Sequence, residues 1–201
     1  MNPIDPAASA LLVVDLQNDT VGEAGAFADS GAADFASRHG VVDKARLVVD
    51  AARGTGLQVI HIWHVDEPGH VDSTRNAKLF RDIADADGLV RGTWGVKPVE
   101  GLEPREGDVV VEKQRMSAFN STTLDTKLRG LGATKVVVLG AWTNFAIEHT
   151  CRDAADSGYE VVLVTDATAT VSDEWHHAAV SYALTNIAEL VTTDEVLATL
   201  S

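Results

Sequence analysis

The chain has 201 residues, which is enough for one α/β domain with a large core, and its single cysteine, Cys151, excludes an intramolecular disulfide. It carries 30 acidic and 16 basic residues, a formal net charge of −14, so it would repel nucleic acids and anionic membranes. The acidic residues are scattered along the chain, which favours a solubilising surface over an interaction tail.

The first predicted element is a strand over Ala10 to Asp15, an apolar run without polar alternation. A loop rich in Gly, Ala and Asp follows over Asn18 to Gly40. Val41 to Ala52 has its apolar residues on one stripe of helical period and is followed by Gly54, so it predicts a helix. The next apolar run, Leu57 to Trp63, predicts the second strand.

A second long segment, Val65 to Pro104, leads to a third strand over Asp108 to Lys113. Within this segment Ser73 to Asp85 has a helical apolar pattern, with Ser73 as its expected cap. Long irregular segments in a compact domain are more often lids or pocket walls than idle connections. We therefore expect both long loops to border a binding site.

The second half of the chain alternates strands and helices more regularly. Strands are predicted over Lys135 to Ala141, Glu160 to Ala167 and Ala188 to Thr193. Helices are predicted over Thr122 to Leu131, Asn144 to Ser157, Asp173 to Asn186 and Thr193 to Leu200. The expected caps are Ser172 for the third of these helices and either Thr192 or Thr193 for the last. Unalternating strands joined by helices predict a three-layer α/β/α fold around a six-stranded, mostly parallel sheet. No repeat and no long linker divides residues 1–201, so we expect a single domain.

Three strand ends bring together residues that could carry chemistry, because ligands of open parallel sheets bind at the carboxyl ends of the strands. Asp15 ends the first strand, Lys113 ends the third, and Trp142 to Ala146 follows the fourth and opens a helix. Taken singly, Asp15 could be an ordinary turn residue and Lys113 a solvated strand end. Together they could place an acid, a base and a helix N-terminus around one crevice.

Three stretches resemble the signature blocks of the isochorismatase-like cysteine hydrolases, in the order and at the spacing of that family. They are "LLVVDLQND" from Leu11, "GDVVVEKQRMSAF" from Gly107 and "GAWTNFAIEHTCRDAADSGYEVVLVTDAT" from Gly140. The family includes nicotinamidases, carbamoylsarcosine and ureidoacrylate amidohydrolases and biuret hydrolases. The resemblance covers nearly the whole chain. It implies a Rossmann-like fold and hydrolysis of a C–N bond in a small amide or ureido compound.

The resemblance also assigns roles to individual residues. It implies that Asp15 is the general base and Lys113 its partner, that the backbone N–H groups of Trp142 and Ala146 form the oxyanion hole, and that a cis peptide bond joins Ala141 to Trp142. The family has its nucleophilic cysteine where this chain has Ala146. Such a site is physically coherent, since a helix N-terminus and a lysine stabilise a thiolate, a carboxylate accepts its proton, and backbone N–H groups bind the oxyanion.

Cys151 does not replace the missing nucleophile. It lies five residues after Ala146, which on a helix is more than one turn further along and about 140° around the axis. We therefore interpret Cys151 as a buried structural residue. Arg152 follows Glu148 at the spacing of a helical ion pair, and Thr143 or Asn144 could cap the helix.

We expect no metal or other cofactor. Nicotinamidases of the family bind a divalent ion through an Asp-x-His pair and another His, but here the corresponding region reads "HIWHVDEPGH", without an Asp two residues before a His. His61 and His64 lie three apart in an extended segment and so point to opposite faces, and His70 lies beyond them. The expected substrate-binding residues are Gln17, Phe27, Trp63, Trp94, Phe119, Trp142 and Phe145. This aromatic content suggests a small substrate with a planar or apolar body.

Three functional interpretations remain open. The first is an amide or ureido hydrolase inactivated by a Cys→Ala change at position 146. It is favoured because Asp15, Lys113 and the helix entrance are all retained. The most economical explanation of the change is a deliberate replacement that traps a substrate. The second is an isochorismatase-type vinyl-ether hydrolase with Asp15 as general acid, although those enzymes have roughly Tyr-Ala-His where this chain has Trp-Thr-Asn from Trp142. The third is a pseudoenzyme that binds a ligand without turnover.

The expected setting is the cytoplasm. The N-terminus lacks a basic segment followed by an uninterrupted apolar one, and no apolar run approaches the ~20 residues that span a bilayer. The expected partner is a small amide or ureido substrate, with no nucleic acid and no membrane. The resemblance implies a homodimer or homotetramer.

Overall fold

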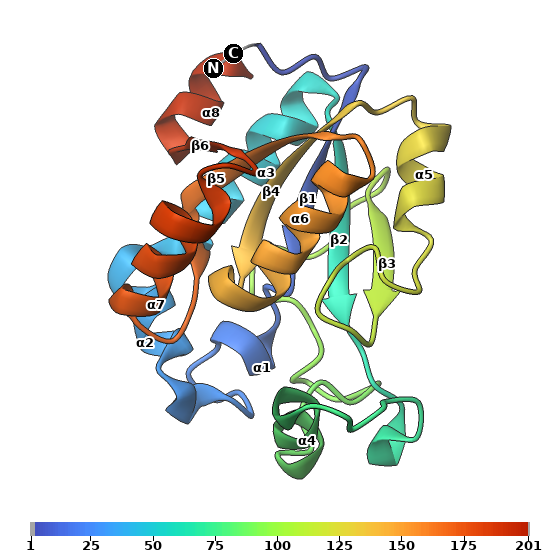
Figure 1. Cartoon of the computed structure of the whole chain (residues 1–201), viewed down its shortest axis with the longest axis vertical. Coiled ribbons are helices and arrows are strands. Elements are labelled where there is room, and N and C mark those ends of the chain that lie inside the picture. Colours follow the sequence, from blue (N-terminus) through green and yellow to red (C-terminus); the bar gives the residue numbers. More distant parts are fainter. Residues whose placement is uncertain (1–2, 201) are drawn as a thin grey trace.

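A six-stranded sheet forms the centre of the molecule (Figure 1). The computed structural model describes residues 3–200, and its strands are β1 (Ser9–Val14), β2 (Gln58–His64), β3 (Val109–Lys113), β4 (Lys135–Ala141), β5 (Glu160–Ala169) and β6 (Glu189–Val191). They lie in the order β3-β2-β1-β4-β5-β6, and each neighbouring pair is parallel. The predicted six-stranded parallel sheet is confirmed, with small shifts in the strand ends.

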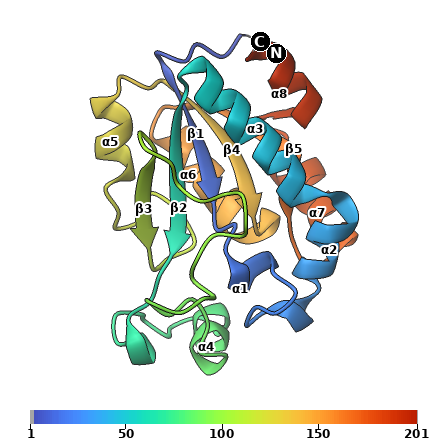
Figure 2. The same ribbon diagram turned by 180° about the vertical axis from the view of Figure 1, so that it is seen from behind.

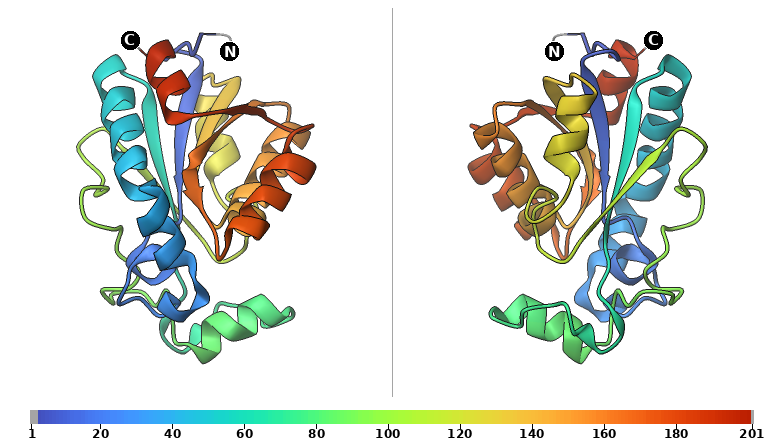
Figure 3. Two further views of the ribbon diagram at one scale, coloured as in Figure 1. Left: turned by 90° about the vertical axis from the view of Figure 1, so that its left-hand side faces the viewer. Right: turned by 90° about the vertical axis from the view of Figure 1, so that its right-hand side faces the viewer.

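Helices cover both faces of this sheet (Figures 2 and 3). They are α1 (Asn18–Val21), α2 (Ala32–His39), α3 (Val41–Thr55), α4 (Lys78–Asp85), α5 (Leu124–Gly130), α6 (Glu148–Asp156), α7 (Asp173–Ala178) and α8 (Thr193–Thr199), with 3-10 turns η1 (Ala28–Ser30) and η2 (Pro68–His70) and π-type turns η3 (Thr143–Ile147) and η4 (Ala179–Leu184). Helices α2, α3 and α8 lie on one face, and α5 and α6 lie on the other. The predicted three layers are confirmed. Among residues 3–200, no helix is long and apolar enough to cross a membrane.

The unalternating strands are explained by two separate cores. Leu11 and Val13 of β1 pack in the cluster that contains the apolar stripe of α3. Leu12 and Val14 point the other way, into the cluster formed with α5 and α6. Because each side of the strand has its own helical cover, both sets of side chains are apolar.

The expected helix caps are partly confirmed. The hydroxyl of Ser172 accepts a hydrogen bond from the N–H of Trp175 at the start of α7, and Thr192 forms a capping box with Glu195 at the start of α8. The expected cap at Ser73 is wrong, because α4 begins at Lys78. Helix α2 lies inside the segment expected to be a loop, where its small, weakly apolar side chains hide the helical period.

The crevice expected at the carboxyl ends of the strands lies where the strand order reverses, between β1 and β4. Gly140 allows the two strands to approach here, since its φ is +133° and a Cβ at this position would collide with the carbonyl oxygen of Val14. Helix α4 lies apart from the layers, beyond these strand ends (Figures 1 and 3). It contributes Phe80 and Ile83 to a small separate core with Leu89.

A buried carboxylate fixes the start of β3, the strand that ends at Lys113. Asp108 accepts hydrogen bonds from Arg53 at 2.6 Å and from the backbone N–H of Arg105 at 2.9 Å, and His61 lies 3.2 Å away. Burial raises the pKa of Asp108, but these hydrogen bonds outweigh burial and hold that pKa below its usual value. The ionised form of Asp108 therefore stabilises the fold.

We expect Asp108→Asn to lower the free energy of unfolding at pH 7 by about 1.5 to 3 kcal/mol, because charge-assisted hydrogen bonds are lost. Because the pKa of Asp108 is lower in the folded protein than in the unfolded chain, ionisation of Asp108 stabilises the fold. This stabilisation is complete above the unfolded-state pKa of about 3.9 and is lost as the pH falls through the folded-state pKa. The difference in free energy of unfolding between the unchanged protein and Asp108→Asn, measured by urea unfolding, should thus shrink below about pH 4. Exposed Asp50, which also contacts Arg53, is the matched control, and Asp50→Asn should cost less than about 1 kcal/mol.

Candidate active site

Asp15 and Lys113 form a buried ion pair at the end of the sheet. The ammonium Nζ of Lys113 lies 2.7 Å from Oδ2 of Asp15 and donates a second hydrogen bond, 3.0 Å long, to the carbonyl of Arg115. Both side chains are almost completely buried. The second carboxylate oxygen of Asp15, Oδ1, is also buried and has no hydrogen-bond partner within residues 3–200. One oxygen is thus held by the lysine while the other is left for a reactant.

Asp15 is held in place by its backbone as well. Its φ of 49° is in the left-handed region, which non-glycine residues seldom adopt. Its N–H donates to the carbonyl of Ile62 at 2.8 Å, and its carbonyl accepts from the hydroxyl of Thr20. These contacts fix the backbone of Asp15 at the end of β1.

The helix entrance after β4 begins with a cis peptide bond between Ala141 and Trp142 and continues as the π-type turn η3. The carbonyl of Trp142 accepts hydrogen bonds from the N–H groups of Phe145 at 3.0 Å and Ile147 at 3.3 Å, on either side of Ala146. The first N–H groups of a helix have no partner further back in it, and π-type turns are frequent at functional sites. Ala146 is therefore placed where backbone donors can face a ligand.

Thr143 and Asn144 do not cap this helix, because the turn has no side-chain cap. The hydroxyl of Thr143 lies 3.2 Å from Nδ1 of His176, and Asn144 accepts a 2.5 Å hydrogen bond from the hydroxyl of Thr170. Both side chains attach the helix entrance to the end of β5 and to α7. The predicted ion pair between Arg152 and Glu148 is present at 3.0 Å on the exposed face of α6.

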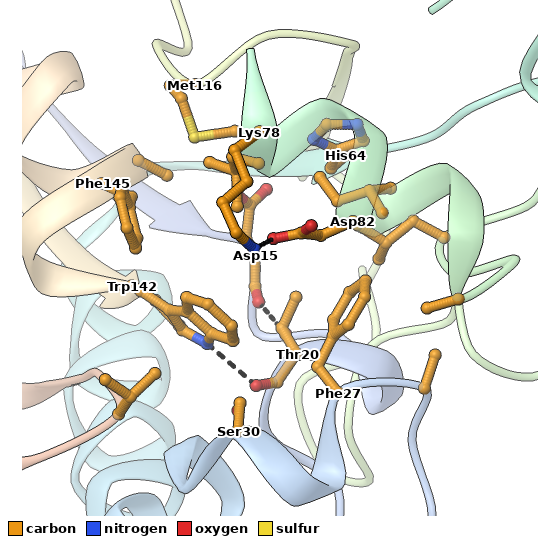
Figure 4. Close-up of a pocket in the computed structure, with 18 of the residues that line it drawn as sticks. Asp15, Thr20, Phe27, Ser30, His64, Lys78, Asp82, Met116, Trp142 and Phe145 are labelled. Atoms are coloured by element: carbon orange, nitrogen blue, oxygen red, sulfur yellow. Dashed lines mark hydrogen bonds and ion pairs between the residues drawn. The ribbon is translucent and has the colours of Figure 1, made fainter. Parts of the chain in front are cut away.

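A cavity of about 870 Å³ opens at these strand ends. Asp15 and Ala146 line it together with three of the predicted aromatic residues, Phe27, Trp142 and Phe145. Figure 4 shows the three rings around the cavity and the indole N–H of Trp142 donating to the carbonyl of Thr20, a bond of 3.0 Å. The candidate acid, the helix entrance and an aromatic wall thus meet in one place.

Four predicted substrate-binding residues lie outside the lining of this cavity. Gln17 is buried, but its amide is used by the backbone of His64 and the carbonyl of Val96, so it joins two loops. Trp63 projects from β2 beside the His61 ring, and Phe119 packs against Tyr159 in the core. Trp94 lies on a loop and is 53% exposed. These four residues were predicted from their places near strand ends or in motifs, and such places do not determine the direction of a side chain.

Other lining residues were not among those predicted. Helix α4 supplies Lys78, Leu79, Asp82 and Ile83, and α7 supplies Trp175, whose ring meets that of Phe145 edge to face. His64 also lines the cavity, and its place at the carboxyl end of β2 was a usable signal. The contribution of α4 agrees with the expectation that the long loops border a site.

His64 belongs to a buried cluster with Asp66 and His70. The carboxylate of Asp66 lies 3.3 Å from His64 and 2.8 Å from His70. Burial raises the pKa of Asp66, but its contacts with His64 and His70 outweigh burial and lower that pKa. His61 is elsewhere, beside Asp108. Within residues 3–200 no three His, Cys, Asp or Glu side chains are gathered as ligands for a metal ion.

Cys151 is fully buried in the core between the sheet and α6. Burial raises the pKa of its thiol to about 12, with a smaller contribution from the charge of Glu148. We therefore expect the native protein to show almost no reaction with Ellman's reagent at pH 8, and to show one reactive thiol after unfolding in urea. Rapid reaction of the native protein would contradict the placement of Cys151.

A parallel sheet with an acid and a lysine paired at its switch point, beside the start of a helix, defines an isochorismatase-like hydrolase fold. The sequence model of the isochorismatase domain matches residues 9–195, so the chain belongs to the isochorismatase family. Ureidoacrylate amidohydrolase RutB of Agrobacterium fabrum is 34% identical over 191 residues, 89% of this chain and 83% of that protein. The RutB protein of Rhizobium rhizogenes is 32% identical over 191 residues, 89% of this chain and 77% of that protein.

Solved structures give the same assignment. A cysteine hydrolase from Pseudomonas syringae superposes with a TM-score of 0.86 at 27% identity, covering 100% of this chain and 95% of that one. N-carbamoylsarcosine amidase from Thermoplasma acidophilum superposes with a TM-score of 0.72 at 26% identity, and the superposition covers 93% of this chain and 97% of that one. The RutB proteins and N-carbamoylsarcosine amidase are thus named as amidohydrolases, enzymes that cleave C–N bonds.

Proposed function

We propose that this chain is the scaffold of a C–N hydrolase for amide or ureido compounds, in which Asp15 is the base, Lys113 holds it, and position 146 is the site of the nucleophile. The observation that carries the proposal is the carboxylate of Asp15. One of its oxygens is paired with Lys113 and the other is buried and has no hydrogen-bond partner within residues 3–200, and Asp15 lines the same cavity as Ala146. The activities named for the amidohydrolase relatives support the same reaction class.

With a cysteine at position 146, the residues can carry out the complete reaction. The thiol proton passes to Asp15 and the sulfur attacks the carbonyl carbon of the substrate, while backbone N–H groups at Trp142 and Ala146 bind the oxyanion. The C–N bond then breaks, and the leaving nitrogen takes the proton from Asp15. Water, deprotonated by Asp15, attacks the thioester and releases the acid, and its proton restores the thiol.

The methyl group of Ala146 cannot form this covalent bond, so we propose that the chain as it stands is inactive and binds its substrate without cleaving it. The test is Ala146→Cys, assayed for ammonia release from amides and ureides. Hydrolysis of isochorismate by the unchanged chain would instead support a vinyl-ether hydrolase with Asp15 as acid. If neither the unchanged chain nor Ala146→Cys hydrolyses any of these compounds, the result would favour a binding protein without turnover.

A further inference from the structure

The cavity is large for the small ureido acid that the ureidoacrylate amidohydrolases are named for. Its volume is about 870 Å³, near the upper end of the ~300–1,000 Å³ range of pockets that enclose drug-sized ligands. Most of its lining is apolar, including Phe27, Leu79, Ile83, Met116, Phe145 and Trp175. A compact polar acid would fill a fraction of this space and leave the apolar wall in contact with water.

The charges on the cavity are also unsuited to a carboxylate. Asp15, Asp29 and Asp82 line it, and the charge of Asp15 is already compensated by Lys113. Within residues 3–200, the lining contains no arginine and a single lysine, Lys78. The ammonium of Lys78 lies 2.6 Å from Asp82, and its side chain is 81% exposed, so solvent screens it (Figure 4).

The remaining basic group on the lining, His64, also lies close to an acid. Its buried Nε2 forms no hydrogen bond within residues 3–200, but it lies 3.3 Å from the buried carboxylate of Asp66. A substrate carboxylate would therefore be moved from water to a place where each nearby cation already faces an acid. Burial of an unpaired charge is strongly unfavourable, whereas an uncharged aryl or alkyl group gains from the same wall.

We propose that this cavity takes an uncharged amide with an aryl or alkyl body and discriminates against ureido acids. The inference deepens the proposed function and rests on it for the site of cleavage. Specificity here is a difference between two affinities, set by the apolar wall, which favours the uncharged ligand, and by the carboxylates on the lining, which oppose the acidic one.

Binding to the unchanged chain tests the inference without any turnover. Calorimetry would compare 4-ethylbenzamide with 4-(carboxymethyl)benzamide, 4-(aminomethyl)benzamide and N-carbamoylglycine at pH 7.5. We expect the ethyl compound to bind at least about 10-fold more tightly than each of the others. An equal or higher affinity for either acid would overturn the inference. So would preference for the cationic compound, or no binding of the ethyl compound.

A charge introduced into the wall tests whether the preference is local. Leu79→Arg places a cation on the cavity, and Val71→Arg is the matched control, since Val71 is 82% exposed and outside the lining. We expect Leu79→Arg to raise the affinity for 4-(carboxymethyl)benzamide relative to 4-ethylbenzamide at least about 5-fold and Val71→Arg to leave that ratio near its starting value. Equal changes in both variants, or no change in either, would contradict a preference set by the lining.

Turnover by Ala146→Cys separates this inference from the proposed function. No ammonia from any amide, together with tight binding of 4-ethylbenzamide, would refute the proposed function and leave the inference intact. Efficient cleavage of N-carbamoylglycine, with a kcat/KM above that for 4-ethylbenzamide, would support the proposed function and overturn the inference. The expected result is cleavage of both, with kcat/KM at least about 10-fold higher for the uncharged amide.

Discussion

Ala146→Cys is expected to raise the rate of ammonia release from a suitable amide by at least about 10³-fold over the unchanged chain. The physical reason is that the proposed reaction needs only a thiol in addition to what the structure provides: Asp15 is held by Lys113, and the helix entrance begins beside position 146. The measurement is a coupled ammonia assay over a panel of amides and ureides, with burst kinetics to detect the acyl-enzyme. Mass spectrometry would identify the covalent adduct at position 146.

Two further changes control this experiment. Cys151→Ser in the Ala146→Cys background should retain the new activity, because Cys151 is buried in the core and takes no part in the reaction. Asp15→Asn in the same background should remove most of it, since the amide side chain cannot accept the thiol proton. Activity that depends on Cys151, or that survives Asp15→Asn undiminished, would refute the assigned roles.

Lys113→Met is expected to lower the free energy of unfolding by about 3 to 5 kcal/mol, the largest stability effect that we expect from a single change. Lys113 and Asp15 are both buried and 2.7 Å apart, so removal of the ammonium leaves an uncompensated carboxylate in the interior. Urea unfolding at pH 7 measures the loss.

The double variant Asp15→Asn with Lys113→Met is the control for this prediction. It removes both charges, so it should be more stable than Lys113→Met alone and should show a coupling energy of about 1 to 3 kcal/mol in a double-mutant cycle. Additive losses would mean that the two side chains do not interact in solution as they do in the structure.

Several features were predictable because they depend on local pattern. Apolar runs without alternation predicted β1 to β6, and the resemblance to the family's motifs implied that Asp15 and Lys113, at the ends of β1 and β3, are partners. The crevice could be placed because the strand ends of a parallel sheet share an edge. Gln17 shows the limit of this reasoning: it lies two residues after Asp15 in the sequence, yet its amide is used to hold the backbone of His64.

The lining of the cavity depends on contacts between distant parts of the chain. The carboxylate of Asp19 accepts hydrogen bonds from the N–H of Ala26 at 2.9 Å and the N–H of Leu89 at 2.7 Å, and so joins two loops that are 70 residues apart. This junction brings Phe27 and the segment after α4 to the same cavity. No periodicity or spacing in the sequence encodes such a bond.

The sequence by itself determined the layered fold and the family signature, because strand patterning and motif spacing are properties of short segments. Tertiary structure alone decided that α4 and Trp175 wall the cavity, that Trp94 lies outside it, and that Lys78 faces Asp82. The physical reason is that side-chain direction and charge compensation arise from packing between elements far apart in the chain, and these set which substrates the site can accept.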